Sequence, residues 1–135
     1  MSLVLDTNVL VAAARTADPD HEPCSRLLRD ARERLVVPSP ALVEVDHLLR
    51  SGRLWMAILA DITGHALIVE DLELADYERV HGLMARYADL RVGFVDCAVL
   101  AVVERLGEPK LATLDRRHFA AMRPAHVDSL ELLPG

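Results

Sequence analysis

The segment from Gly93 to Val103 is apolar on every side of a helix except at Asp96. A helix that is apolar all round has to be buried on all sides, so this segment requires a core that encloses it. With 135 residues the chain has room for one such core. Hydrophobic residues make up 52% of the sequence but aromatic residues only 4%. An aliphatic core of this kind is typical of parallel strands covered by helices on both faces.

Two short apolar segments are each followed directly by an aspartate. Asp6 follows Leu3–Leu5, and Asp115 follows Leu111–Leu114. We interpret each segment as a buried strand and the residues after it as a turn and the start of a helix. The carboxyl ends of parallel strands meet at one edge of a sheet, where ligands bind in open α/β folds. We therefore expect Asp6 and Asp115 at the same edge.

Asp96 and Glu44 are expected to reach that edge from helices. The helix that carries Glu44 is predicted to begin with Ser39 as its N-cap and Pro40 at its first position. A buried carboxylate costs several kcal/mol unless a cation holds it. We expect all four acidic residues to be buried in apolar surroundings and to bind metal ions. Asp46 is the alternative to Glu44.

Each of the three aspartates also has an ordinary structural explanation. Asp6 and Asp115 could cap the helices that follow them, since aspartate is a favoured N-cap residue. Asp96 lies in the first turn of its helix, where the helix dipole stabilises a negative charge. These roles are compatible with metal binding.

Strands and helices alternate along the whole chain, which predicts one α/β domain over residues 1–135. Strands are predicted at 2–5, 35–37, 66–69, 110–114 and 127–132. Helices are predicted from the first turn to about residue 15 and at 22–33, 39–51, 53–62, 74–88, 93–106 and 117–122. This order predicts a three-layer α/β/α sandwich around a mainly parallel five-stranded sheet.

Carboxylate ligands select hard cations, so Mg²⁺ or Mn²⁺ is the expected cofactor. The six histidines show no zinc-binding spacing, and the sequence lacks a Walker loop, a GxGxxG motif and a GxSxG motif. Phosphoryl or phosphodiester chemistry is then the leading class of reaction. The net charge of −6 argues against a general electrostatic nucleic-acid binder, although bound divalent ions would reverse the charge locally.

The sequence also bears on the compartment. No stretch is long and apolar enough for a membrane span, and the apolar amino terminus has no basic leader, so we expect no export. Two cysteines, Cys24 and Cys97, provide no disulfide framework. We expect a cytoplasmic protein.

Four blocks of the sequence together carry a family resemblance. Leu3–Asn8, Pro38–Val45, Phe94–Ala98 and Ala112–Phe119 resemble the PIN-domain ribonucleases. Their order, their spacing and the total length look most like the VapC-type toxins of bacterial toxin–antitoxin pairs. The resemblance implies a parallel α/β/α sandwich, a Mg²⁺- or Mn²⁺-dependent endoribonuclease and inhibition by a cognate VapB-type antitoxin. It also implies cleavage of transfer RNA or ribosomal RNA loops, leaving a 5′ phosphate and a 3′ hydroxyl.

The resemblance assigns roles to individual residues. The family's acidic quartet matches Asp6, Glu44, Asp96 and Asp115. These side chains would hold one or two metal ions that activate a water for in-line attack. Asn8 would cap the first helix or orient a bound water, and Thr113 would be a supporting hydroxyl near Asp115. Cys97 stands where the family more commonly has alanine, and Arg91 stands in a loop that often has proline.

Residues outside the quartet are candidates for RNA binding, packing and dimerisation. Arg91, Arg116 and Arg117 are candidates for RNA binding, although the last two could form a solvated turn. We expect His118 to serve packing or the surface rather than catalysis. Trp55 is first of all a core residue, but together with Met56 it could also cover a homodimer face, as the family commonly dimerises.

Two other functions compete with the nuclease. Asp6-Thr7-Asn8 resembles a degraded start of the aspartyl-phosphate phosphatases, but Asn8 replaces their second acidic residue and only Lys110 is available as a lysine. The other alternative is an RNA- or protein-binding module of the same fold that has lost turnover. With all four acidic residues present, the nuclease is preferred.

Overall fold

The structure, a computed structural model, describes all 135 residues and has five parallel strands in one sheet. The strands are β1 (Ser2–Leu5), β2 (Arg34–Pro38), β3 (Ile68–Glu70), β4 (Lys110–Ala112) and β5 (Glu131–Leu133). Their order in the sheet is β3-β2-β1-β4-β5, so the first strand lies in the middle. All four residues of β1 are buried because helices cover both faces of the sheet. The predicted parallel α/β fold is confirmed.

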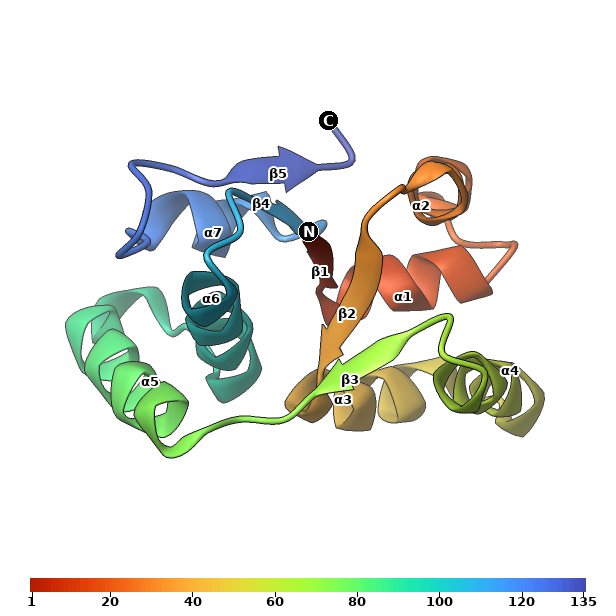
Figure 1. Cartoon of the computed structure of the whole chain (residues 1–135), viewed down its shortest axis with the longest axis horizontal. Helices are drawn as coiled ribbons and strands as arrows, with labels where there is room; N and C mark the ends of the chain where they lie inside the picture. The colour runs from red at the N-terminus through yellow and green to blue at the C-terminus, as the bar shows by residue number, and fades with distance from the viewer.

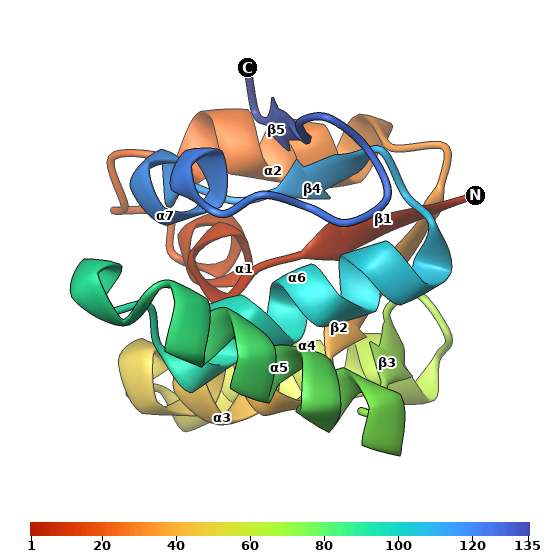
Figure 2. The same ribbon diagram turned by 90° about the vertical axis from the view of Figure 1, so that its left-hand side faces the viewer.

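Seven α-helices and one 3₁₀ helix complete the fold. They are α1 (Thr7–Ala14), α2 (His21–Asp30), α3 (Ser39–Leu49), α4 (Gly52–Thr63), α5 (Leu74–Arg86), η1 (Ala88–Leu90), α6 (Phe94–Leu106) and α7 (Arg116–Ala121). Figure 1 shows α1, α2 and α4 on one side of the sheet and α5, α6 and α7 on the other, and Figure 2 shows α5 and α6 side by side.

The two faces of the sheet have separate cores. Because successive side chains of a strand point to opposite faces, Leu3 and Leu5 pack with α1, α2, α3 and α4, whereas Val4 packs with α5, α6 and α7. In α6 every residue from Cys97 to Val103 is buried. The segment is therefore enclosed from Cys97 onward, whereas Gly93 and Phe94 at its amino end are exposed. The residue after α6 is Gly107, whose φ of 68° is favourable for glycine.

Some predicted boundaries are wrong. Ser39 is the first residue of α3 rather than its N-cap, and no side chain caps this helix, although Pro40 lies in the first turn as expected. The last strand is Glu131–Leu133 rather than 127–132, because β4 offers only three residues for pairing. The third strand begins only at Ile68, since the N–H groups of Ala66 and Leu67 both donate to Asp61 at the end of α4.

None of the helices combines the length and the apolar character that crossing a bilayer would require.

Candidate metal centre

Asp6 directly follows β1 and Asp115 lies beyond the carboxyl end of the neighbouring strand β4, which stops at Ala112 rather than at the predicted Leu114. The backbone N–H of Asp6 donates to the carbonyl of Ala112 at 2.8 Å and fixes this end of the pairing. Thr113 then links the two aspartates: its hydroxyl donates to Asp6 Oδ2 at 2.8 Å and accepts the N–H of Asp115 at 3.0 Å. Thr113 is completely buried. Its hydroxyl contacts both aspartates, and its supporting role at a metal site stays a prediction.

Asp6 is the most enclosed carboxylate of the group, with 2% of its surface exposed. It caps α1 by accepting the N–H of Thr7 at 2.8 Å. Burial raises the pKa of Asp6 to about 6; the charges of Asp96 and Glu44 also raise it, whereas the hydrogen bonds from Thr113 and Thr7 lower it. All of its hydrogen-bond donors are neutral groups. The negative form of Asp6 is therefore short of a cation.

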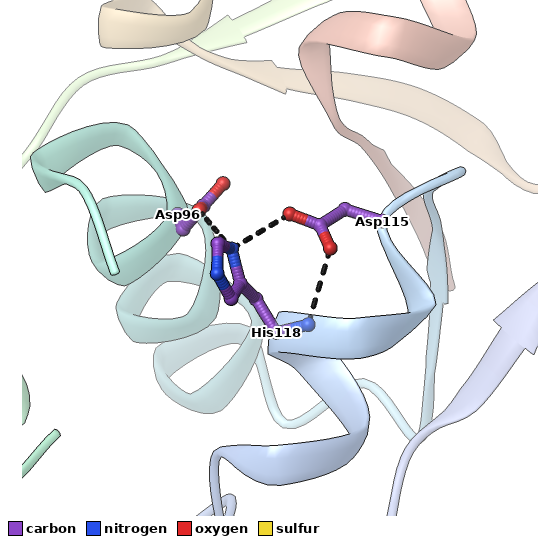
Figure 3. A group of neighbouring side chains, drawn as sticks. All are labelled: Asp96, Asp115 and His118. Carbon is purple, nitrogen blue, oxygen red and sulfur yellow. Dashed lines mark hydrogen bonds and ion pairs between the residues drawn. The ribbon is translucent and has the colours of Figure 1, made fainter. Parts of the chain in front are cut away.

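Asp96, Asp115 and His118 form the tightest part of the site (Figure 3). His118 Nδ1 lies 3.1 Å from Asp96 Oδ2 and 2.9 Å from Asp115 Oδ2. One potential ligand atom from each of the three residues lies within 4.8 Å of the others. Burial foremost, and then the charge of Asp115, raises the pKa of Asp96, while His118 lowers it.

The position of His118 is a correction to the expectation that it serves packing or the surface. Asp115 caps α7 and accepts the N–H of His118 at 3.1 Å, so His118 lies in the first turn of this helix. Residues three apart lie on the same side of a helix, which turns the imidazole back toward Asp115. That spacing is the one signal in the sequence that could have found this residue.

Glu44 approaches the site from α3, but the expectation that it is buried is wrong. Its side chain lies at the exposed rim of the site, where Thr7 Oγ1 donates to Glu44 Oε1 at 2.8 Å. Thr7 itself is buried and was not predicted to take part. Glu44 and Asp6 thus join the site through threonine hydroxyls and lie outside the tight group of three. The side chain of Asp46, the alternative, is exposed and has no hydrogen bond or ion pair.

The three candidate RNA-binding arginines lie in different environments. The guanidinium of Arg116 donates hydrogen bonds to the carbonyl of Leu132 at 3.3 Å and to the carbonyl of Pro134, so it connects α7 to the last strand and the residues after it. Arg117 is exposed and makes no hydrogen bond or ion pair through its side chain. Arg91 is also exposed, with a φ of 54°. Arg117 and Arg91 keep their charges free for a ligand, and Arg116 does so less.

Asn8 does not cap the first helix, contrary to one of its two expected roles. The helix begins one residue earlier, at Thr7, and Asp6 is its cap. Asn8 lies within the first turn and is exposed.

The donor set fits a hard divalent cation. Asp6, Glu44, Asp96 and Asp115 have no lysine or arginine as an ion-pair partner, and His118 is the one basic group in contact with any of them. Carboxylates that repel one another at a sheet edge and have no arginine or lysine as a counter-ion are suited to Mg²⁺ or Mn²⁺. The remaining coordination positions would be open to water and a phosphate.

The sequence of the chain is similar to that of known proteins. The family model described as "PIN domain" matches residues 3–123. Over 135 residues the chain is 30% identical to ribonuclease VapC26 of Mycobacterium tuberculosis, covering 98% of this chain and 100% of the relative.

Two solved structures have the same fold. The crystal structure of M. tuberculosis VapC20, described as a sarcin-ricin loop cleaving toxin, superposes with a TM-score of 0.80 at 23% identity, over 96% of this chain and 99% of that one. VapBC2 from Rickettsia felis, bound to a DNA fragment from their promoter, gives a TM-score of 0.67 at 18% identity over 98% of both chains.

Proposed function

Since this chain belongs to the PIN-domain family, we propose that it is a metal-dependent endoribonuclease, a VapC-type toxin inhibited by a cognate VapB-type antitoxin. The observation that carries the proposal is the group of carboxylates at the carboxyl edge of β1 and β4, which has no lysine or arginine of its own. Full-length similarity to a ribonuclease supports it.

Asp96 and Asp115, with Asp6 and Glu44 beside them, would hold Mg²⁺ or Mn²⁺. When bound, such an ion supplies a water of lowered pKa and stabilises the charge that develops on the phosphodiester. The chain's own hydrogen bonds orient the carboxylates: Thr113 holds Asp6, and Thr7 holds Glu44. Outer groups of this kind fix the ligand geometry and tune metal affinity.

We propose looped RNA as the substrate, from ribosomal or transfer RNA, because unpaired nucleotides expose their backbone to a shallow site. The cleavage of the sarcin-ricin loop stated for VapC20 supports a ribosomal RNA loop. Arg117 and Arg91 would contribute phosphate contacts from the rim.

We also propose that the protein pairs with a second copy of itself. The expected face on α4 has one well-exposed apolar residue, Met56, whereas Trp55 packs against the core. A broader apolar surface lies over α3, α5 and the start of α6, where Val43, Tyr77 and Phe94 are all exposed and line one cleft with Glu44. Exposed apolar groups that are contiguous favour an interface. We assign the dimer contact to this surface, and Tyr77→Glu should yield monomers in light scattering where Met56→Glu does not.

An antitoxin partner is supported by the VapBC2 complex, whose fold this chain shares. The cytoplasmic location stays a prediction; Cys24 and Cys97 are both free and buried.

The test is cleavage of total cellular RNA by purified protein freed of antitoxin, in Mg²⁺ or Mn²⁺ and in EDTA. We expect metal-dependent cuts at one or a few sites that disappear with Asp96→Asn. Asp46→Asn is the matched control, because it removes the same charge from an exposed side chain without partners. A folded, metal-binding preparation that cuts no RNA would overturn the proposal.

A further inference from the structure

His118 lies between the two carboxylates of the tight group, and its hydrogen bond to Asp96 leaves Asp115 Oδ2 close to the same nitrogen. One ring nitrogen, Nδ1, lies within 3.1 Å of Asp96 Oδ2 and 2.9 Å of Asp115 Oδ2. A single N–H proton cannot be aimed well at two acceptors on different segments of the chain. One cation in contact with all three atoms would satisfy both oxygens and the nitrogen together.

The distances suit neighbouring ligands of one ion. Octahedral ligands about 2.1 Å from a metal lie about 3 Å from their nearest neighbours. The two nitrogen–oxygen distances agree with that spacing.

The three side chains are also exposed to solvent to a similar extent. The exposed fraction is 24% for His118, 21% for Asp96 and 25% for Asp115. His118 is held in place because Asp115 accepts its backbone N–H at the start of α7.

We propose that His118 supplies a nitrogen ligand beside Asp96 and Asp115, so that this site favours Mn²⁺ over Mg²⁺. The inference rests on the proposed function for the role of Asp96 and Asp115 as ligands. Mg²⁺ binds oxygen donors almost exclusively, whereas transition-metal ions accept imidazole as well as carboxylate. His118 therefore adds more to the affinity for Mn²⁺ than to the affinity for Mg²⁺.

The direct test is pulsed electron paramagnetic resonance of Mn²⁺ bound to the antitoxin-free protein, which detects a ¹⁴N nucleus bonded to the metal. We expect nitrogen coupling in the wild type, its loss with His118→Ala, and its retention with His81→Ala. His81 is the matched control because it is exposed on α5, outside the site. Circular dichroism shows whether each variant is folded.

Calorimetry of Mn²⁺ and Mg²⁺ binding gives a second readout. His118→Ala should lower the ratio of Mn²⁺ to Mg²⁺ affinity by roughly tenfold. His118→Asp replaces nitrogen by oxygen, so it should bind Mg²⁺ at least as well as the wild type while losing the preference for Mn²⁺. It also keeps an ionisable group at this position if the alanine variant does not fold.

The outcomes separate the two proposals. Mn²⁺ that binds without nitrogen coupling, or an affinity ratio that His118→Ala leaves unchanged, would overturn the nitrogen ligand and leave the nuclease standing. Tighter binding of both ions by His118→Ala would show that the imidazole occupies the metal position as a competitor, which also overturns it. A wild-type protein that binds neither ion would refute the metal-dependent nuclease itself.

Discussion

A cluster of acidic residues lies at each end of α6, and the two clusters differ in whether an arginine compensates their negative charge. At the carboxyl end, Arg105 lies 2.8 Å from Glu70, 2.9 Å from Asp76 and 3.5 Å from Glu73. At the amino end, Asp96 meets Asp115 and His118, with no arginine or lysine in contact. The first group contains an arginine, which is always charged, whereas the imidazole of His118 is the one basic group in the second.

The comparison shows that a buried acidic residue is not by itself a sign of function. Asp76 is as deeply buried as Asp6, with 3% and 2% of the surface exposed. Asp76 bonds to Arg105 and accepts the N–H of Glu73 at the start of α5, so its charge is compensated within the fold. Asp6 accepts bonds from neutral donors only, and its pKa is raised to about 6. What distinguishes the candidate site is that no arginine or lysine contacts its carboxylates.

The largest expected effect comes from removing one charge at the amino end of α6. Asp96→Asn should lower RNA cleavage at least about 100-fold, because a metal ligand contributes several kcal/mol to the stabilisation of the transition state. The measurement is the initial rate of cleavage at saturating metal. A variant of unchanged activity would remove Asp96 from the proposed ligands.

At the other end of the helix the same kind of change should affect folding rather than activity. Arg105→Met leaves Asp76 buried without its cation and should cost about 2 kcal/mol in the free energy of unfolding, less than for a fully enclosed pair because Arg105 keeps some exposure. Urea denaturation measures the loss. Cleavage by the folded variant should stay near the wild-type rate, and a large drop in activity without a loss of stability would contradict the division between the two ends.

Asp6→Asn and Asp76→Asn should have effects of opposite sign on stability in EDTA at pH 7.5. Because the pKa of Asp6 is raised from 3.8 to about 6 in the folded protein, the wild type loses stability as the pH rises through this interval. Asp6→Asn avoids that loss and should be more stable by about 2 kcal/mol above pH 6, though inactive. Asp76→Asn gives up its pairing with Arg105 and should be less stable.

Thermal unfolding from pH 4 to 8 tests this pair of variants. The gain of Asp6→Asn should fade toward pH 4, where the wild-type carboxyl is protonated. A gain that is independent of pH would show that the charge of Asp6 is not its cause.

The smallest effect is expected at an ion pair on the surface. Arg26 and Glu22 lie 3.3 Å apart on α2, with 61% and 66% of their side chains exposed. Arg26→Ala should change the free energy of unfolding by less than about 0.5 kcal/mol, because water screens such pairs. Urea denaturation with and without added salt measures this change and gives the reference value for the Arg105 variant. If Arg26→Ala lost as much free energy of unfolding as Arg105→Met, burial would not determine the strength of these ion pairs.

The sequence predicted those parts of the fold in which a buried position requires an apolar side chain. The all-apolar segment around Asp96 required a central helix, and the apolar segments before Asp6 and Asp115 indicated neighbouring parallel strands. Boundaries were harder to predict, because β5 takes its length from the three residues of β4 rather than from its own composition.

Parts of the site depend on contacts between distant segments and so left little trace in the sequence. Thr7 meets Glu44, and Thr113 meets Asp6, across 37 and 107 positions. A threonine beside an aspartate is too common to predict either bond. Glu44 was expected to be buried because its helix is apolar, yet the site opens to solvent on that side. His118 was set aside because a single histidine without a partner motif carries little information.

The central position of β1 has a consequence during translation. Its neighbour β4 is made more than a hundred residues later, and Thr113, Asp115 and His118 come later still. Until those residues leave the ribosome, Asp6 lacks the hydroxyl of Thr113 to hold it and Asp96 has neither of its close partners. Contacts of such long sequence separation form late. A partly synthesised chain therefore lacks the complete acidic group, so the nuclease activity proposed for this site would begin only after most of the protein has been made.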